Sequence, residues 1–124
     1  MDDTILIPRA AQEMLARDST NRGDRERLAL FYILGSVSKL KRMQTRIYDF
    51  KERQIIPEVL SQADFSHGER CMLKLAFHLY NGWECPSVRD LFSTFDEDFR
   101  TIALKAIAIR FRWSELVFEP EDGA

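Results

Sequence analysis

We expect the chain to pack around residues 66–82, which read SHGERCMLKLAFHLYNG. Ser66 and Glu69 have the spacing of a capping box, in which each side chain binds a backbone N–H of the first helical turn. Asn81 and Gly82 are residue types that enter the left-handed conformation at a helix end. At about 100° per residue, apolar side chains cover roughly two-thirds of the circumference. The pattern predicts a central helix over residues 66–81 that neighbouring elements cover on several sides.

Length and composition favour one soluble domain over residues 1–124. The net charge is −2, 45% of the residues are hydrophobic and nine are Phe, so a core can form without a disulfide, metal or cofactor. There is neither an apolar run of about 18 residues nor a basic-then-apolar start. We therefore expect a cytoplasmic protein that makes no membrane contact, with Cys71 and Cys85 as free thiols.

Helix-capping residues, proline and turn residues predict the structure of the segments before the central helix. Residues 1–7 are expected to form an extended arm or edge strand, because Pro8 keeps the residue before it out of the helical region. Residues 47–56 place aromatic and β-branched side chains on both sides of a short polar turn, which predicts a small β-hairpin. Helical spacing and caps predict helices over residues 8–17, 24–35 and 36–43.

Two helices are expected after the central helix. Ser87 can cap a short one. Thr94 and Glu97 repeat the capping-box spacing before a long helix that runs to about Arg112. Residues 119–124 are expected to form a flexible acidic tail. The complete pattern predicts a mainly α-helical, compact domain of about five helices with a small hairpin.

Six short segments resemble a known family. They are 31-FYILG-35, 47-IYDF-50, 56-IPEVL-60, 75-LAFHLYNG-82, 90-DLFS-93 and 106-AIAIRF-111. Their order is similar to that in a family of short uncharacterised proteins, domains of unknown function, from Gram-positive bacteria and their phages or mobile elements. The resemblance covers about residues 24–111. It implies a shared fold and a phage or mobile-element origin, but no reaction, because none of the segments is a catalytic signature.

Four residues of metal-ligand type, His67, Cys71, His78 and Cys85, lie in one short span. On a helix His67 and Cys71 are one turn apart, whereas His78 lies roughly 10 Å further along the axis. Zinc holds its ligands at about 2.0 to 2.3 Å, so we predict no metal site. Cys71 and His67 also have the spacing of a nucleophile and its base. A small thiol or hydrolytic enzyme is therefore one alternative, although we assign no catalytic residue.

Basic residues gather in the segment 39–53, which carries six basic and two acidic residues in a chain of net charge −2. A second basic face is formed by Arg100, Lys105 and Arg112. If the two faces adjoin, they are suited to follow a phosphate backbone. The candidate nucleic-acid-binding residues are Lys39, Lys41, Arg42 and Arg46.

Arg110 falls near Phe99 and Ile102 on the apolar face of the last helix. A charge on such a face is costly unless it is paired, so we expect an ion pair with an inward carboxylate such as Asp49 or Glu58. The alternatives are an early end of the helix or a contact with another protein chain.

Trp83, Trp113 and Phe118 are large aromatic residues in connector or tail positions. They either close the ends of the core or, together with Arg110, contact a partner, because aromatic residues and Arg are enriched in interface cores. We therefore predict a non-enzymatic protein-binding protein, adaptor-like or inhibitor-like, whose partner is another protein or a second copy. The alternatives are a nucleic-acid-associated regulator that uses residues 39–53 and, third, the thiol enzyme.

Overall fold

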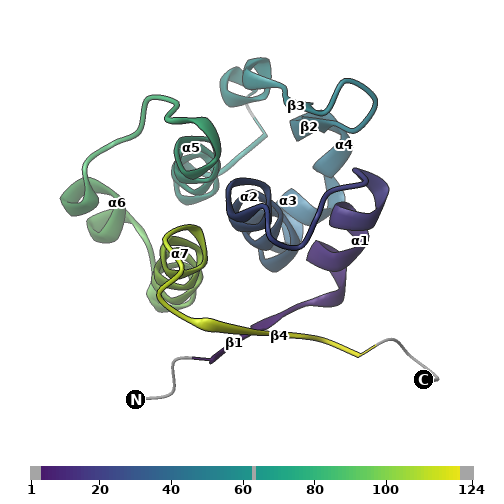
Figure 1. Cartoon of the computed structure of the whole chain (residues 1–124). Helices are drawn as coiled ribbons and strands as arrows, with labels where there is room; N and C mark the ends of the chain where they lie inside the picture. The colour runs from purple at the N-terminus through teal and green to yellow at the C-terminus, as the bar shows by residue number, and fades with distance from the viewer. Residues whose placement is uncertain (1–3, 63, 121–124) are drawn as a thin grey trace.

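Seven α-helices make up most of the part of the chain that the computed structural model describes, residues 4–62 and 64–120 (Figure 1). The predicted mainly α-helical fold is confirmed, with more helices than the five or so expected. The helices are α1 (Arg9–Arg17), α2 (Arg25–Ser36), α3 (Ser38–Arg42), α4 (Gln44–Ile47), α5 (His67–Asn81), α6 (Val88–Thr94) and α7 (Glu97–Arg110), with a 3-10 helix η1 (Pro57–Ser61). The strands are β1 (Thr4–Ile7), β2 (Tyr48–Asp49), β3 (Gln54–Ile55) and β4 (Glu115–Phe118).

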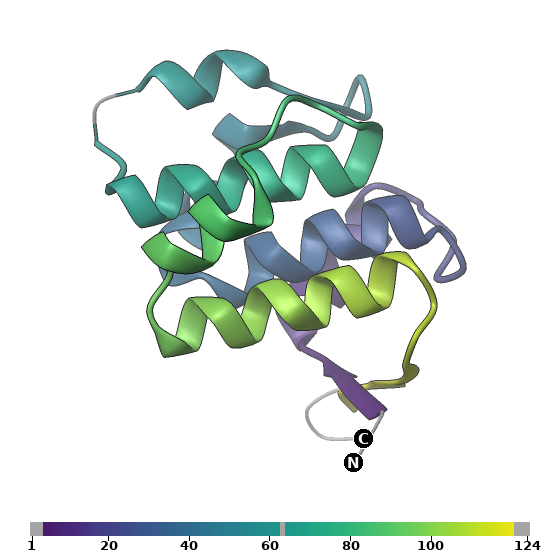
Figure 2. The same ribbon diagram turned by 90° about the vertical axis from the view of Figure 1, so that its left-hand side faces the viewer.

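The centre of the packing is α2 rather than the predicted helix over residues 66–81. Asp24 caps α2 by accepting a hydrogen bond from the Arg27 backbone N–H (3.0 Å), and every residue from 28 to 34 is buried. Helices α1, α3, α5 and α7 all contact it. Figure 2 shows α5, α2 and α7 lying alongside one another, and Figure 1 shows α2 to one side of α5 and α7, which also contact each other. A continuous apolar run is thus buried on all sides, as its composition requires.

Helix α5 forms as the sequence predicts. The Glu69 N–H donates to Ser66 Oγ (3.1 Å), and the Ser66 N–H donates to the Glu69 carboxylate (2.8 Å), so both bonds of the capping box are present. The helix ends at Gly82, whose φ of 80° is left-handed. Glycine tolerates this conformation because it has no Cβ. Helix α7 begins differently from the prediction, because Asp96 rather than Thr94 accepts the capping bond, from the Phe99 N–H (2.8 Å).

Gly35 brings α1 close to α2. A Cβ at this position would lie 3.0 Å from the Ala11 backbone nitrogen and 3.2 Å from the Ala10 Cβ. The helix was predicted to end at Gly35, but it continues to Ser36. The glycine therefore serves the contact between the two helices rather than the end of α2.

Two short sheets tie the chain ends and one loop to the helices. Strands β2 and β3 pair antiparallel, which confirms the predicted hairpin. Strand β1 pairs in parallel with β4, so residues near the two ends of the chain lie side by side (Figure 1). The Glu119 N–H then donates to the Ile7 carbonyl (3.0 Å). Of the predicted arm and tail, residues 1–3 and 121–124 lie outside the described residues.

Candidate functional site

A pocket of about 700 Å³ opens between α5, α6 and α7. We call it the α5–α7 pocket. Most of the residues that line it are apolar, with one carboxylate, one imidazole and one guanidinium among them. The lining residues are Glu26, Leu75, His78, Leu79, Tyr80, Asn81, Gly82, Cys85, Pro86, Val88, Leu91, Phe92, Ile107, Arg110 and Phe111.

The connector between α5 and α6 shapes one wall of the pocket. Gly82 turns the chain away from the end of α5, and His78 Nδ1 lies 2.9 Å from the Trp83 carbonyl oxygen. Ser87 then caps α6 by accepting a hydrogen bond from the Asp90 N–H (3.1 Å). These contacts set α6 apart from the end of α5. The space between them is the apolar pocket.

Arg110 lies in this pocket, but the predicted ion pair with Asp49 or Glu58 is wrong. Its Nε donates to the Leu79 carbonyl at the end of α5 (2.7 Å), and its Cζ lies 5.1 Å from the centroid of the Phe111 ring. Asp49 instead accepts hydrogen bonds within its own hairpin turn. Helices α5 and α7 are in contact. The last carbonyls of a helix have no partner within it, so one at the end of α5 can accept the Arg110 hydrogen bond in place of a carboxylate.

The three aromatic residues predicted to join Arg110 do not line the pocket with it. Phe118 is half-buried on β4, with the Arg22 Cζ 3.9 Å from its ring centroid. Trp113 is 81% exposed beyond the end of α7, and Trp83 is exposed in the α5–α6 connector. None of the three lines the α5–α7 pocket.

Val88 and Phe111 are two pocket residues that sequence reasoning did not assign to a site. Val88 is 68% exposed and Phe111 is 57% exposed, and both line the pocket. The signal in the sequence that could have found them is that each is an apolar residue at a helix end and lies off the face that packs on the core. That α6 and the end of α7 line one pocket could not be inferred from residue spacing.

Cys71 and His67 do not form an activated pair. The Cys71 Sγ lies 3.9 Å from the His67 Nε2, and the thiol is buried. Burial raises the pKa of Cys71, which favours the thiol over the nucleophilic thiolate. Within residues 4–62 and 64–120, no three His, Cys, Asp or Glu side chains come together in a group that could hold a metal ion.

Some of the candidate basic residues of segment 39–53 make local contacts, and the others face solvent. The Lys39 ammonium donates to the Asp64 carbonyl (2.6 Å), and Arg46 forms an ion pair with the Asp64 carboxylate (3.8 Å). Lys41 and Arg42 are exposed on α3. Two of the four candidate residues therefore hold the loop before α5, and two face solvent.

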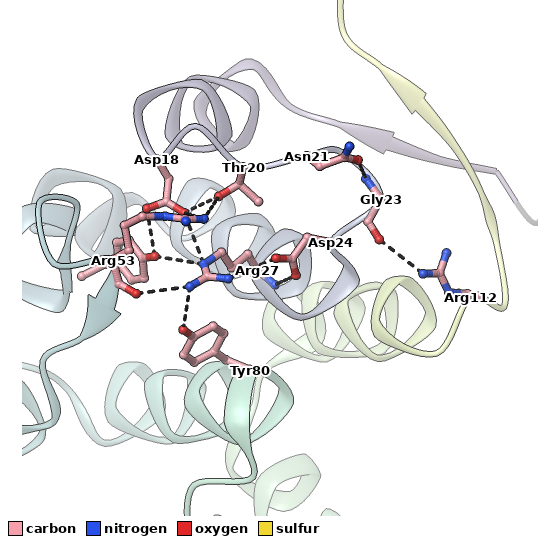
Figure 3. Close-up of polar contacts among 10 residues, drawn as sticks. Asp18, Thr20, Asn21, Gly23, Asp24, Arg27, Arg53, Tyr80 and Arg112 are labelled. Carbon is pink, nitrogen blue, oxygen red and sulfur yellow. Dashed lines mark hydrogen bonds and ion pairs between the residues drawn. The ribbon is translucent and has the colours of Figure 1, made fainter.

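A buried carboxylate, missed by sequence reasoning, forms a second polar cluster. Asp18 is only 2% exposed. Tyr48 donates to its Oδ1 (2.9 Å), Arg27 Nε lies 3.2 Å and Arg53 Nη2 3.4 Å from its Oδ2, and the Thr20 hydroxyl also donates to it. Figure 3 shows Arg27, Arg53 and Thr20 turned toward Asp18. We call these five residues the Asp18 cluster.

Arg27 extends the Asp18 cluster across the fold. Its Nη1 donates to Asp24 (3.1 Å), and its Nη2 donates to the Tyr80 hydroxyl and to the Arg53 carbonyl (both 3.2 Å) (Figure 3). Burial lowers the pKa of Arg27, but hydrogen bonds with Tyr48 and Asp24 outweigh burial, so the pKa is raised overall. The cluster joins α1, α2, the hairpin and α5.

Comparison with known proteins gives a family. The family DUF6075, a family of unknown function, matches residues 9–119. The chain belongs to DUF6075. No curated protein and no solved structure matches it. In the described part of this DUF6075 protein, no helix is both long and apolar enough to cross a membrane.

Tyr48 is expected to make the stability of the DUF6075 domain depend on pH. Burial raises the pKa of Tyr48 to about 12, with Arg27 lowering it and Asp18 raising it. An unfolded Tyr has a pKa of about 10, so the folded state keeps this proton more tightly and stability falls as the pH rises between about 10 and 12. We expect the free energy of unfolding to decrease by about 2 to 3 kcal/mol across this range. Urea unfolding at several pH values measures it.

The control for this pH dependence is Tyr48→Phe, which removes the titrating hydroxyl. Its free energy of unfolding should change less steeply with pH than that of the wild type above about pH 10. Parallel curves for the two proteins would show that the Tyr48 hydroxyl is not the group responsible.

Proposed function

We propose that this protein is a non-enzymatic protein-binding domain, adaptor-like or inhibitor-like, that receives apolar side chains of a partner protein in the α5–α7 pocket. The observation that carries the proposal is an open, apolar pocket whose rim is formed by the exposed side chains of Val88 and Phe111. The proposal also places the protein in the cytoplasm, as a product of a phage or mobile element of Gram-positive bacteria. That part rests on the resemblance of the six sequence segments.

The chemistry of the pocket favours binding over catalysis. Binding sites are mostly apolar with a few polar groups that fix orientation, and the α5–α7 pocket has this composition. Exposed aromatic and aliphatic side chains beside a hollow are typical of surfaces that a partner covers. Cys71, the nucleophile of the enzyme alternative, does not line the pocket and has a raised pKa because it is buried.

The test uses peptides selected from a displayed random library on the immobilised protein. We expect the double variant Val88→Ser/Phe111→Ser to bind the selected peptides at least about tenfold more weakly, because apolar anchors at the centre of an interface carry much of its affinity. Both side chains are already exposed, so the substitutions should leave the fold intact. Fluorescence anisotropy with labelled peptides measures the affinities.

Leu104→Ser is the matched control for this test. Leu104 is 59% exposed on α7 but lies outside the pocket, so the same loss of exposed apolar surface should leave affinity unchanged. If the double variant binds as well as the wild type, the pocket is not the binding site. If no peptide is selected, the protein-binding function itself is contradicted.

The second candidate function is a nucleic-acid-associated regulator. It is favoured by one observation, the exposure of Lys41 and Arg42 on α3. If this function holds, Lys41→Glu/Arg42→Glu abolishes binding to nucleic acid, and wild-type binding weakens steeply as salt is raised. An unchanged affinity in this variant would rule out the basic segment.

A further inference from the structure

Three arginines gather around the last turn of α7, and one of them, Arg110, lines the α5–α7 pocket. Arg25 Nη1 donates to the Ile109 carbonyl (3.3 Å), and Arg112 Nη2 donates to the Gly23 carbonyl (3.3 Å). Figure 3 shows Arg112 directed toward Gly23, in the loop before α2. Arg110 lines the pocket itself and donates to a carbonyl at the end of α5. We call these residues the arginine cluster.

All three guanidinium groups bind backbone carbonyls rather than carboxylates. Among the described residues, none of the three has a carboxylate oxygen within ion-pair distance. The Arg25 Nε is buried without a hydrogen-bond partner in the same part of the chain. Burial and the neighbouring charge of Arg112 both lower the pKa of Arg25. The cluster is therefore a local group of positive charges that no carboxylate of the described residues pairs directly.

Two nearby groups reduce this charge without cancelling it. The C-terminus of a helix has a partial charge of about −0.5, and both α5 and α7 end here. Glu26 lines the pocket and contributes one carboxylate. The three guanidinium charges, less the two helix ends and the Glu26 carboxylate, leave an excess of about one positive charge, although the whole chain is net negative. Because salt screens charges beyond about 10 Å, the local excess rather than the net charge governs what approaches the pocket.

We infer that the partner segment of the α5–α7 pocket is acidic: it places apolar side chains in the pocket and carboxylates against the arginine cluster. This inference rests on the proposed protein-binding function. Charge complementarity beside an apolar site sets the choice of partner and the rate of encounter. Arginine is suited to this role because its planar guanidinium binds a carboxylate through two parallel hydrogen bonds.

A nucleic acid fits this site less well than an acidic protein segment. Its phosphates would satisfy the arginines, but the neighbouring surface is a pocket lined mainly by aliphatic and aromatic carbon. A segment of alternating apolar and acidic residues satisfies both surfaces at once. Its apolar side chains would fill the pocket, and its carboxylates would pair with guanidinium groups that bind only backbone carbonyls in the free protein.

The experiment selects peptides from a random displayed library on the wild-type protein at low salt and compares their composition with the unselected library. We expect the selected peptides to combine Leu, Phe or Trp with Asp or Glu. Their affinity should fall several-fold when salt is raised from about 50 to 500 mM, since exposed ion pairs are screened. A labelled single-stranded DNA of random sequence is included as a competitor and should not displace the peptides.

Arg112→Glu tests the arginine cluster directly. Arg112 is exposed and lies beyond the end of α7, and we expect this variant to bind the acidic peptides about fivefold or more weakly, because attraction becomes repulsion. Lys41→Glu makes the same charge change on α3 and should have little effect. Circular dichroism checks the fold of each variant, and the salt dependence of the wild type is a readout that needs no variant.

The possible results separate the inference from the proposed function. Selected peptides that are apolar but neutral or basic, with affinities unchanged by Arg112→Glu, would overturn the acidic partner and leave the protein-binding function standing. Displacement of the peptides by the DNA would overturn it in favour of nucleic acid. If no peptide were selected, both the inference and the proposed function would fail.

Discussion

Asp18→Ala is expected to lower the free energy of unfolding by about 2 to 3 kcal/mol, because a buried carboxylate that accepts several hydrogen bonds is lost. The carboxylate is the acceptor on which Arg27, Arg53 and Tyr48 converge. Its removal leaves the Tyr48 hydroxyl buried without its acceptor, and unpaired buried groups are destabilising. The cost is a large part of the roughly 5 to 15 kcal/mol by which a small domain is stable. Chemical denaturation at neutral pH measures it.

Glu13→Ala is the control for the Asp18 substitution. Glu13 is an exposed carboxylate on the same helix, α1, so its removal should change stability by no more than about 0.5 kcal/mol. Asp18→Asn keeps the shape of the side chain and should fall between the two. A loss of less than about 1 kcal/mol in Asp18→Ala would mean that the cluster contributes specificity of packing rather than stability.

Local signals in the sequence were sufficient to place α5. The capping box at Ser66 and Glu69 and the left-handed Gly82 depend only on residues close in the chain, and local patterns of this kind are readable without tertiary information. The hairpin over β2 and β3 was predicted on the same basis. The family match agrees with the resemblance to uncharacterised proteins and extends it to residues 9–119.

Contacts between segments that are distant in the chain could not be predicted from local sequence signals. The pairing of β1 with β4 joins residues more than 100 positions apart, and neither strand shows which partner it has. Asp18 lies after α1 in what reads as a polar loop, yet Tyr48 and Arg53 come from the hairpin to bury it. Arg110 was expected to need a carboxylate, whereas the end of α5 supplies a carbonyl. Each outcome depends on tertiary neighbours.

The α5–α7 pocket depends on apolar residues at helix ends, which the periodicity of a helix does not identify. A helical pattern identifies the face that packs on the core, but Val88 and Phe111 lie at helix ends and off that face. Only the turn of the chain at Gly82 and the placement of α6 bring them to one hollow. The binding role stays a prediction, and the site now proposed for it consists of different residues, of which only Arg110 was among the partner-binding candidates.

Phe31→Ala is expected to lower the free energy of unfolding by about 3 to 5 kcal/mol, the range for removing a fully buried aromatic ring. Phe31 lies on α2 and is completely buried, with its ring 5.0 Å from that of Tyr48 and 6.0 Å from that of Phe50, measured between centroids. Residues on all sides of α2 are packed, so the cavity has little room to collapse. Thermal and urea unfolding measure the loss.

Phe111→Ala makes the same chemical change at the α5–α7 pocket and is the matched control. Its ring is largely exposed, so the substitution should cost no more than about 1 kcal/mol of stability while weakening the binding of selected peptides. The two variants thereby separate the side chains that hold the fold from those that meet the partner. Equal losses of stability would contradict this separation, because they would place Phe111 in the packed core and leave the pocket without an exposed aromatic rim.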